Sequence, residues 1–483
     1  MTQEDFAKAL ATSQSAVARM ESGKQNFSTQ ELLKISSVLN RKIMTISNSL
    51  DFEITGGRKL SGSITTNFSK NGSVVLLCAA LLNKSKTTLH GISRIEEVYR
   101  LIEAIESLGV AVRWIDQNSL EINPPQEFNF DSLHSESASR IRSSLMLIGS
   151  LVHSVKSFQL PYAGGCKMGN RTIAAHRYGL ESLGVRISTK SNFYQIEAKK
   201  LRPAEIVMYE AGDTAANNLL MASALIPGKT TIRFAPANYQ VQELCFFLTK
   251  MGVKIEGIGT TTLVVHGIKE FSAPLEYHNS EDPIESMMFI SAAVTTQSEL
   301  SILRCPIDFL SVELLKLEKM GLKFTISNRY KSYNGHTALV DITVFPSRLK
   351  ALADKIHALP YPGINSDNLP FFVPIATQCE GTTLVHDWMW ENRAIYFTEL
   401  NRLGASIALA DPHRVFITGV TKLKATQIVC PPALRPAMII LIAMLASEGT
   451  SILRNVYSIN RGYEEIAERL NSIGADIKVM EGI

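Results

Sequence analysis

The chain has 483 residues, of which 45% are hydrophobic and 19% charged, a composition that excludes wholesale disorder. Its 49 Lys and Arg residues are nearly balanced by 45 Asp and Glu residues, so the net charge is +4 and any basic site must be a local cluster. The six cysteines stand singly, without a CxxC pair or a His–Cys cluster, which argues against a disulfide framework and against a structural zinc site.

The first ten residues already carry Glu4, Asp5 and Lys8 and do not read as a signal peptide. The longest apolar runs have only about ten to twelve residues, too few to span a bilayer. We therefore expect a cytoplasmic protein with no membrane partner. The length predicts about three domains.

Residues 1–50 form a polar segment with helical periodicity that differs from the rest of the chain. Thr2 and Asp5 are spaced as a capping box for a first helix, and Ser13 can cap a second helix that runs through Arg19. The segment resembles the helix-turn-helix domain of the Xre/Cro type, and the matching residues are Thr2, Gln3, Phe6, Ala7, Ser13, Ser15, Val17, Arg19, Met20, Glu21 and Gly23.

In that family the start of the second helix enters the DNA major groove. The resemblance therefore implies that Gln14, Ser15 and Arg19 face bases or phosphates, with DNA as a partner of residues 1–50. The alternatives are a docking module or a vestige, because this segment carries little excess positive charge for neutralising phosphates.

From residue 53 onward one pattern recurs six times, about every 70 residues. A helix ends in Leu, Met or Ile, then Gly, then an apolar or small residue, and an alternating strand follows. The glycines are Gly109, Gly184, Gly252, Gly321, Gly404 and Gly474. A glycine at this place is the left-handed residue that ends a helix. Between these copies lie helices that are apolar nearly all round and are expected to be central, so the pattern favours closed α/β globules with inner helices and outer sheets over a solenoid.

Isolated basic residues open several otherwise apolar helices. Lys70 and Asn71 lie in FSKNGSVVLL, Arg142 in ESASRIRSSLMLIG, Arg435 in ALRPAMIIL and Arg461 in INRGYEEI. Helix N-termini favour anions and the Arg fork binds carboxylates and phosphates. For each residue alone, the alternative is a solvated or snorkelling side chain.

Three further residues stand out between the repeats. Cys166 lies in PYAGGCKMGNR, where flanking glycine argues against a core thiol and neighbouring Lys167 favours the thiolate. Asp367 in PGINSDNLPFF opens a helix after a loop, where a simple N-cap carboxylate is the alternative. Arg393 lies in WENRAIYF.

With these motifs, residues 52–480 resemble the enolpyruvyl transferases, and specifically the branch that acts on UDP-N-acetylglucosamine. The resemblance implies an α/β fold of two inverted barrels with three repeats each: one of residues 52–70 and 280–483, the other of residues 71–279 with the Cys loop. It also implies transfer of enolpyruvyl from phosphoenolpyruvate to the 3-hydroxyl of UDP-N-acetylglucosamine or a related nucleotide. That reaction starts peptidoglycan precursor synthesis and requires no metal or cofactor.

The resemblance also implies a role for each matching residue. Asp367 takes the hydroxyl proton and Cys166 gives a proton to the methylene carbon. The donor is held by four cations: Lys70, Arg171, Arg435 and Arg461. The remaining substrate contacts are Asn71, Arg142, His176 and Arg393.

Three segments depart from the family pattern. Ala433 precedes Leu434-Arg435 where the family has Asp, residues 172–175 replace Pro-Val-Asp-Leu, and residues 210–214 replace a nucleotide-contacting Lys-x-Ser-x-Gly region. Two hypotheses follow: an enzyme with an altered nucleotide side, or a DNA-binding regulator whose degenerate transferase body senses a nucleotide sugar.

Overall fold

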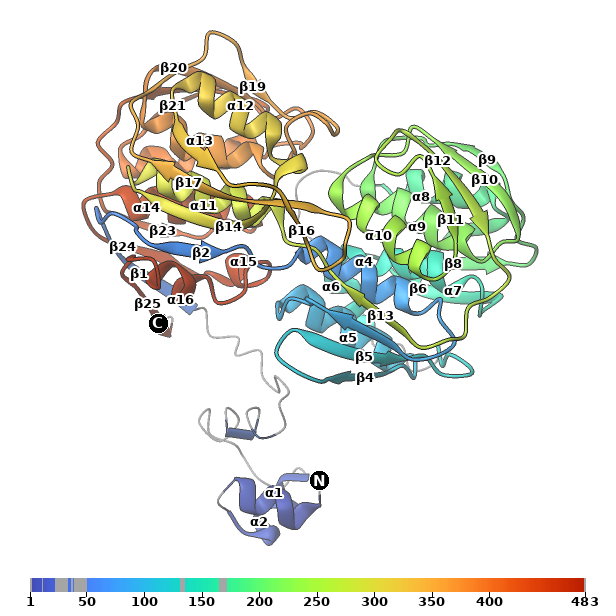
Figure 1. Ribbon diagram of the computed structural model, residues 1–483. Helices are drawn as coiled ribbons and strands as arrows, with labels where there is room; N and C mark the ends of the chain where they lie inside the picture. The colour runs from blue at the N-terminus through green and yellow to red at the C-terminus, as the bar shows by residue number, and fades with distance from the viewer. Residues whose placement is uncertain are drawn as a thin grey trace. The chain divides into compact units, whose positions relative to one another are not determined.

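The computed structural model describes residues 2–10, 12–21, 34–35, 38, 50–130, 135–164 and 172–481. The chain forms two compact units, one of Met1–Leu50 with Glu481–Ile483 and one of Asp51–Met480 (Figure 1). None of the described helices is long and apolar enough to cross a membrane.

The small unit contains two short helices, α1 (Gln3–Ala9) and α2 (Gln14–Glu21). The predicted capping box is present, because Thr2 accepts from the backbone N–H of Asp5 while the Asp5 carboxylate accepts from that of Thr2. The predicted cap of the second helix is confirmed as well, since Ser13 Oγ accepts from the backbone N–H of Ala16 at 3.2 Å.

In the described part of the larger unit, the strands form six small sheets. Three are built from the first and last strands of the chain. Their orders are β23-β24-β1-β25, β15-β17-β14-β2 with β16 beside β17, and β18-β20-β22-β21 with β19 beside β20. The bounds are β1 Leu50–Gly56, β2 Ser63–Thr65, β14 Leu300–Pro306, β15 Lys323–Ile326, β16 Tyr330–Lys331, β17 Ala338–Phe345, β18 Leu349–Lys350, β19 Ile356–His357, β20 Cys379–His386, β21 Ser406–Asp411, β22 Arg414–Gly419, β23 Gln427–Val429, β24 Gly449–Arg454 and β25 Ile477–Glu481.

The other three sheets come from the middle of the chain, with orders β13-β3-β5-β4, β6-β8-β7 and β11-β12-β10-β9. Their strands are β3 Thr87–His90, β4 Ala111–Trp114, β5 Ser119–Asn123, β6 Ser157–Pro161, β7 Val185–Thr189, β8 Phe193–Ala198, β9 Glu205–Val207, β10 Gly228–Arg233, β11 Lys254–Glu256, β12 Thr262–Gly267 and β13 Leu275–His278.

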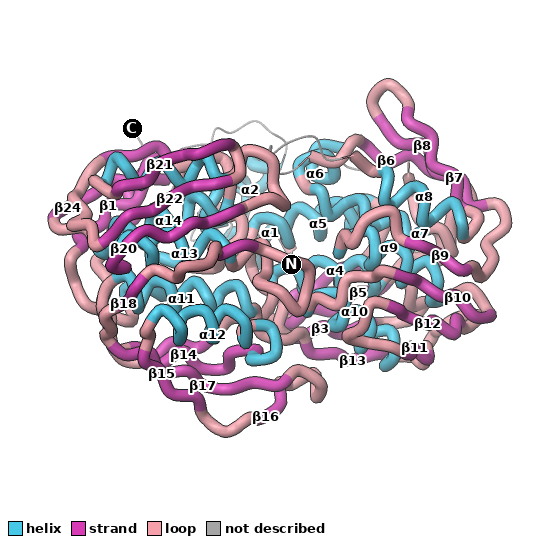
Figure 2. The backbone as a smooth tube through the Cα atoms, turned by 90° about the horizontal axis from the view of Figure 1, so that it is seen from above, coloured by secondary structure: helices cyan, strands magenta, loops and turns pink. Residues whose placement is uncertain are grey.

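The helices lie inside each group of sheets, as Figure 2 shows. The most apolar helices are the most buried: every residue of α11 (Pro283–Thr295) is buried, and so is α14 (Leu434–Ala446) from Leu434 to Leu445. The other helices are α4 Lys70–Ala80, α5 Glu96–Ser107, α6 Ser135–Arg140, α7 Leu147–Leu151, α8 Ala174–Ser182, α9 Asp213–Ala224, α10 Tyr239–Lys250, α12 Ser311–Met320, α13 Phe372–Thr377, α15 Tyr457–Asn460 and α16 Ile466–Asn471, with 3₁₀ segments η1 Arg142–Met146, η2 Ile307–Phe309, η3 Leu369–Phe371 and η4 Ala394–Leu403.

The six repeat glycines have the conformation predicted for them. Their φ angles lie between 87° and 102°, a region that L-residues with a Cβ rarely adopt. Each glycine follows the end of a helix and turns the chain into the next strand, so the sequence prediction of six helix-to-strand repeats is confirmed.

Candidate active site

Two chain segments run side by side where the strands of the two groups connect. The backbone N–H of Ser69 donates to the Ser280 carbonyl at 2.7 Å, and that of Asp282 donates to the Asn67 carbonyl at 2.8 Å. Helix α4 begins directly after this crossing at Lys70, and the Ser69 hydroxyl caps it. The paired backbones therefore hold the start of α4 in place.

Lys70 is the first charged group at the crossing. Its Nζ lies 2.6 Å from Glu97 Oε2, and its backbone N–H donates to Asp282 at 3.2 Å. Burial by itself would raise the pKa of Glu97, but the positive charges of Lys70 and Arg461 hold that pKa below its ordinary value. An anion arriving here would meet cations that one carboxylate already partly neutralises.

Arg461 lies at a cavity beside Lys70. The cavity has a volume of about 360 Å³ and is lined by Glu96, Glu97, Arg100, Ile141, Tyr457 and Arg461. Two carboxylates and two guanidinium groups thus share one small opening, which suits a small polyanion better than an apolar ligand.

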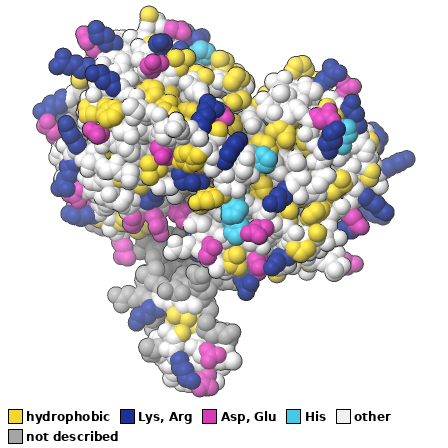
Figure 3. Space-filling model, in the orientation of Figure 1, with side chains coloured by type: hydrophobic (Ala, Val, Ile, Leu, Met, Phe, Trp, Pro, Cys, Tyr) yellow, Lys and Arg dark blue, Asp and Glu magenta, His cyan; other side chains and the backbone are white. Residues whose placement is uncertain are grey.

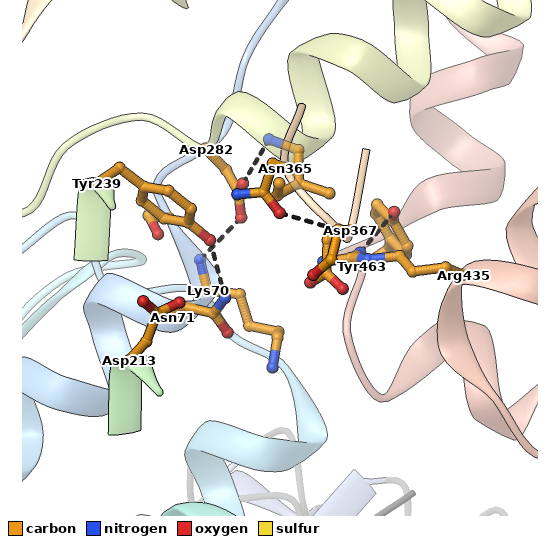
Figure 4. Close-up of polar contacts among 12 residues, drawn as sticks. Lys70, Asn71, Asp213, Tyr239, Asp282, Asn365, Asp367, Arg435 and Tyr463 are labelled. Carbon is orange, nitrogen blue, oxygen red and sulfur yellow. Dashed lines mark hydrogen bonds and ion pairs between the residues drawn. The ribbon is translucent and has the colours of Figure 1, made fainter. Parts of the chain in front are cut away.

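Asp367 lies in the loop that precedes η3, and Figure 4 shows it next to Arg435. One carboxylate oxygen is 3.0 Å from Arg435 Nη2 and the other is 3.8 Å from Arg393 Nη1. Burial opposes ionisation, yet Arg435 and Arg393, with a contribution from Lys70, lower the pKa of Asp367 below its ordinary value. The group is therefore a carboxylate at neutral pH.

Arg435 is buried near the start of α14 and joins two elements. Its Nη1 donates to the Tyr463 hydroxyl at 2.7 Å, and its Nη2 donates to Asp367. The N-cap of this helix is Ala433, which is buried and makes no side-chain cap. The structure thus places the residue that departs from the family pattern two positions before the guanidinium that holds Asp367.

Arg393 lies behind Asp367 in the interior. Its side chain is 1% exposed, and it forms a fork with Asp387 at 2.5 and 2.9 Å while also donating to the Ser366 carbonyl at 2.6 Å. Asp387 and the Ser366 carbonyl accept the hydrogen bonds of this guanidinium and fix its place. Arg393 is therefore suited to position Asp367. The direct substrate contact that the resemblance implies for Arg393 stays a prediction.

Asn71 points from α4 toward α10. Its side-chain amide donates to the Tyr239 hydroxyl at 2.8 Å (Figure 4). Burial raises the pKa of Tyr239 well above its ordinary value, and the carboxylates of Asp282 and Asp367 add to the effect. Tyr239 is therefore a neutral phenol that accepts from Asn71 and keeps a proton to donate.

A line of side chains joins the start of α9 to the Asp367 loop. Asp213 accepts from Asn238 at 3.0 Å, Asn238 accepts from Asn365 at 3.3 Å, and Asn365 accepts from the backbone N–H of Asp367 at 2.8 Å. Burial raises the pKa of Asp213 to about 6, and the negative charge of Asp367 contributes. Two carboxyl groups of different proton affinity thus border the same site.

Two other predicted residues, Arg142 and His176, hydrogen-bond to elements other than the Asp367 loop. Arg142, at the start of η1, donates to the Thr172 carbonyl at 2.9 Å. His176 is 3% exposed between α8 and α9, where its Nδ1 accepts from the Asn218 amide at 2.8 Å. The interior position of His176 suits support of α9, and the ligand contact implied by the resemblance stays a prediction.

Comparison with known proteins decides the family. Residues 54–470 match the model described as EPSP synthase (3-phosphoshikimate 1-carboxyvinyltransferase). The chain belongs to the EPSP synthase family of enolpyruvyl transferases. Residues 1–45 match a helix-turn-helix model, so the predicted N-terminal helix-turn-helix is confirmed.

Relatives of this enolpyruvyl transferase include two bacterial proteins named UDP-N-acetylglucosamine 1-carboxyvinyltransferase. The one from Bradyrhizobium diazoefficiens is 34% identical over 429 residues, covering 89% of this chain and 98% of the relative. The one from Treponema denticola is also 34% identical and covers 89% of this chain and 99% of the relative.

Two solved structures share the fold. The enolpyruvyl transferase NikO from Streptomyces tendae has a TM-score of 0.79 at 24% identity, covering 90% of this chain and all of NikO. EPSP synthase from Acinetobacter baumannii has a TM-score of 0.70 at 17% identity, covering 89% of this chain and all of that protein. The predicted fold class, two inverted α/β barrels with a small helical module, is confirmed.

Two of the predicted residues of this transferase, Cys166 and Arg171, lie outside the described residues. Their roles stay predictions from sequence. On the small unit, Gln14, Ser15 and Arg19 are exposed on α2, which is compatible with the predicted contact to DNA.

Several site residues have no counterpart in the sequence prediction, namely Glu97, Asn238, Tyr239, Asp282, Asn365 and Tyr463. Asp282 had a detectable signal, since it stands before Pro283 as an N-cap stands before a first-turn proline. Asp213 lies in the altered 210–214 segment noted from sequence. For Asn238 and Asn365 no local pattern exists, because their pairing depends on distant segments meeting.

Proposed function

We propose that this chain transfers the enolpyruvyl group of phosphoenolpyruvate to the 3-hydroxyl of UDP-N-acetylglucosamine or of a related nucleotide acceptor. The observation that carries the proposal is the Asp367–Arg435 pair in a chain that aligns over 98% of a relative with that name. Lys70 acts electrostatically on Asp367, and Arg461 acts on Glu97, the partner of Lys70, so both cations can serve the donor.

The proposed reaction has two steps. In the first, the acceptor hydroxyl oxygen bonds to C2 of the donor, Asp367 takes the hydroxyl proton and Cys166 gives a proton to C3. In the second, C3 returns a proton to the Cys166 thiolate, the bond from C2 to the phosphate oxygen breaks, and the leaving phosphate takes the proton held by Asp367, so the products are an enolpyruvyl ether and phosphate. Asp367 enters the reaction ionised, because Arg435 and Arg393 lower its pKa.

The donor carries a phosphate and a carboxylate, so it would compete with Glu97 for the cations Lys70 and Arg461. Arg435 is already paired with Asp367, so it is suited to keep that carboxylate positioned next to the donor. On the acceptor side, Asn71 and Tyr239 offer an amide and a phenol hydrogen bond near Asp367. These contacts suit a hydroxylated sugar.

Phosphate release tests the proposal directly. Phosphoenolpyruvate is incubated with the protein and UDP-N-acetylglucosamine, with UMP and shikimate 3-phosphate as comparison acceptors. We expect phosphate to be released only when UDP-N-acetylglucosamine or the nucleotide UMP is present. We expect no release by the Asp367→Asn variant. Release with shikimate 3-phosphate alone would assign the chain to the other branch, and release with none of the acceptors would refute an active transferase.

A second candidate function is that of a DNA-binding regulator whose larger unit senses a nucleotide sugar. The supporting observation is the helix-turn-helix match over residues 1–45, together with the exposed polar residues of α2. We propose that a nucleotide sugar bound to the larger unit alters DNA affinity. Fluorescence anisotropy with duplex DNA, with and without UDP-N-acetylglucosamine, tests this. If adding the protein leaves the anisotropy of the DNA unchanged at every salt concentration, the chain does not bind DNA and this second function is refuted.

A further inference from the structure

The outer face of the β13-β3-β5-β4 sheet carries a cluster that the proposed reaction does not use. Strands β3 and β13 are parallel, with His278 opposite His90 and Glu276 opposite Thr88. In both strands inner and outer residues alternate, so His90, Glu276 and His278 lie on the outer face. Figure 3 shows histidine side chains with an acidic side chain beside them over the β13 region.

The three side chains are close enough to share one ion. One ligand atom from each lies within 4.8 Å of those of the others. His90 Nε2 and Glu276 Oε1 are 2.9 Å apart, and the two imidazole rings stack at 4.4 Å with 20° between their planes. Two ligands of a tetrahedral zinc lie about 3.3–3.4 Å apart, given bonds of about 2.0–2.1 Å, so the spacing already approaches that of a metal site.

A second observation concerns the orientation of His90. Its Nδ1 lies 2.8 Å from the hydroxyl of Ser119, a buried residue directly opposite on β5. A metal-bound histidine usually has its other ring nitrogen held by such a partner, which fixes the tautomer. In the metal-bound state Nδ1–H would donate to Ser119, and the lone pair of Nε2 would face an ion held between it and Glu276.

We propose that His90, Glu276 and His278 bind a divalent transition metal ion of the zinc class, with a fourth position left to water. Two neutral imidazoles and one carboxylate are a ligand set that zinc accepts. The near-parallel rings must tilt toward each other on binding, a rotation about χ2, which is a soft torsion. The ion replaces the proton that His90 Nε2 shares with Glu276.

The neighbouring charges set the strength of this site. Lys250 lies close enough to His278 to interact with it electrostatically, and its ammonium group opposes a cation. Glu276 supplies the one negative charge among the three ligands, and its side chain is 68% exposed. We therefore expect an affinity below that of buried structural zinc sites.

The metal would tie together strands that lead into the crossing. The backbone N–H of Asn279, the residue after His278, donates to the His90 carbonyl at 2.9 Å. The Asn279 side chain also donates to the carbonyls of Ser69 and Gly91 at 2.9 Å. Since Ser69 caps α4, a metal that holds β3 to β13 stiffens the support of Lys70.

The test is titration of the full-length chain with zinc chloride by calorimetry at pH 7.5, with absorption of bound cobalt as the second measurement. We expect one ion per chain, at least tenfold weaker binding in His90→Ala and in His278→Ala, and several-fold tighter binding in Lys250→Met. Glu276→Gln keeps the side-chain shape and is also expected to weaken binding at least tenfold. The same titrations of the Cys166→Ser variant distinguish zinc bound by the histidine cluster from zinc bound by the Cys166 thiol.

The pair of His266 and Glu256, which lie 3.2 Å apart on neighbouring strands without a second histidine, is the matched control. His266→Ala is expected to leave the zinc affinity unchanged. Absence of stoichiometric zinc binding overturns the proposal. The proposal is also overturned if the His90→Ala and His278→Ala variants both bind zinc as tightly as the wild type while their far-ultraviolet circular dichroism is unchanged.

Discussion

At the scale of single residues, Asp367 is the proposed proton acceptor of the reaction, and its loop is tied to helix α14 by an ion pair. It is held by Arg435 at 3.0 Å and by Arg393 at 3.8 Å. We predict that Asp367→Asn lowers kcat about 10²–10⁴-fold, because a positioned proton acceptor is lost, and changes KM little. Steady-state phosphate release checks this. Asp308→Asn, an exposed carboxylate paired with Arg329, is the control, and an equal loss in both variants would contradict the assignment.

A second prediction at this scale concerns Ala433. It is the N-cap of α14, and Pro436 at the third helical position has no N–H, so a cap there can bond mainly to the Arg435 N–H. We predict that Ala433→Asp raises kcat at least tenfold, because its charge would lie near the Arg435 guanidinium and help to hold it. Ala433→Asn supplies a cap without charge and should not raise kcat. Equal gains in both variants would attribute the effect to capping.

Thiol reactivity tests Cys166 without requiring turnover. The other five cysteines are buried, and burial raises the pKa of Cys245, Cys305, Cys379 and Cys430 to about 12. We predict that iodoacetamide at pH 7.5 modifies Cys166 first, because the thiolate is the reactive form, and that phosphoenolpyruvate slows the reaction. Mass spectrometry of digested protein identifies the site. First modification at another cysteine would remove Cys166 from the proposed mechanism.

At the scale of elements, α10 contains a buried acid that links folding to pH. Burial raises the pKa of Glu243 to about 8, and Glu281 adds to this, while hydrogen bonds from Tyr277 and Asn334 oppose it. Because the folded pKa is above the unfolded value, the fold binds the extra proton between about pH 4.5 and pH 8. Stability from this group is complete below pH 4.5 and is lost as the pH rises through 8.

We therefore predict that the wild-type free energy of unfolding falls from pH 5 to pH 8.5 by roughly 2–5 kcal/mol more than that of Glu243→Gln. Urea unfolding at several pH values measures the difference, and subtracting the two curves cancels the other titrating groups. Glu299→Gln, at an exposed position, should follow the wild type. Parallel curves for wild type and Glu243→Gln would show that Glu243 has an ordinary pKa in the fold.

At the scale of the whole molecule, the two compact units separate at residue 50. We predict that a chain beginning at Asp51 keeps kcat within about twofold, because every proposed catalytic residue lies beyond that point, and loses DNA affinity, since DNA binding rests on charged and polar groups of the small unit. Phosphate release and anisotropy with duplex DNA measure the two effects. Equal DNA binding by both chains would place any nucleic-acid contact on the larger unit.

The larger unit has a predicted internal division that stays a prediction. Its sheets use strands either from β1 to β2 and β14 to β25, or from β3 to β13, and the proposed boundaries are residues 52–70 with 280–483 against 71–279. The Asn238–Asn365 hydrogen bond joins the two sets of elements, and Asn238 directly precedes Tyr239. Opening and closing of such a division would act on the same side chains that we place around the acceptor.

The sequence by itself determined the features that depend on neighbouring residues. The six helix-ending glycines, the capping box at Thr2, the apolar runs of α4 and α14, and the family resemblance all follow from local spacing, because helix periodicity and caps are set within a few residues. The placement of Lys70, Asp367 and Arg435 was likewise inferred from motifs.

Only the tertiary structure decided which side chains meet. Asp367 and Arg435 are joined because a loop and a helix far apart in the chain approach each other, and His90 lies beside His278 because β3 pairs in parallel with β13. The same holds for the contact of His176 on α8 with Asn218 on α9, while the substrate contact that the resemblance implies for His176 stays a prediction. Such contacts depend on the register of distant strands and on the crossing of the backbone, which no local pattern of residues encodes.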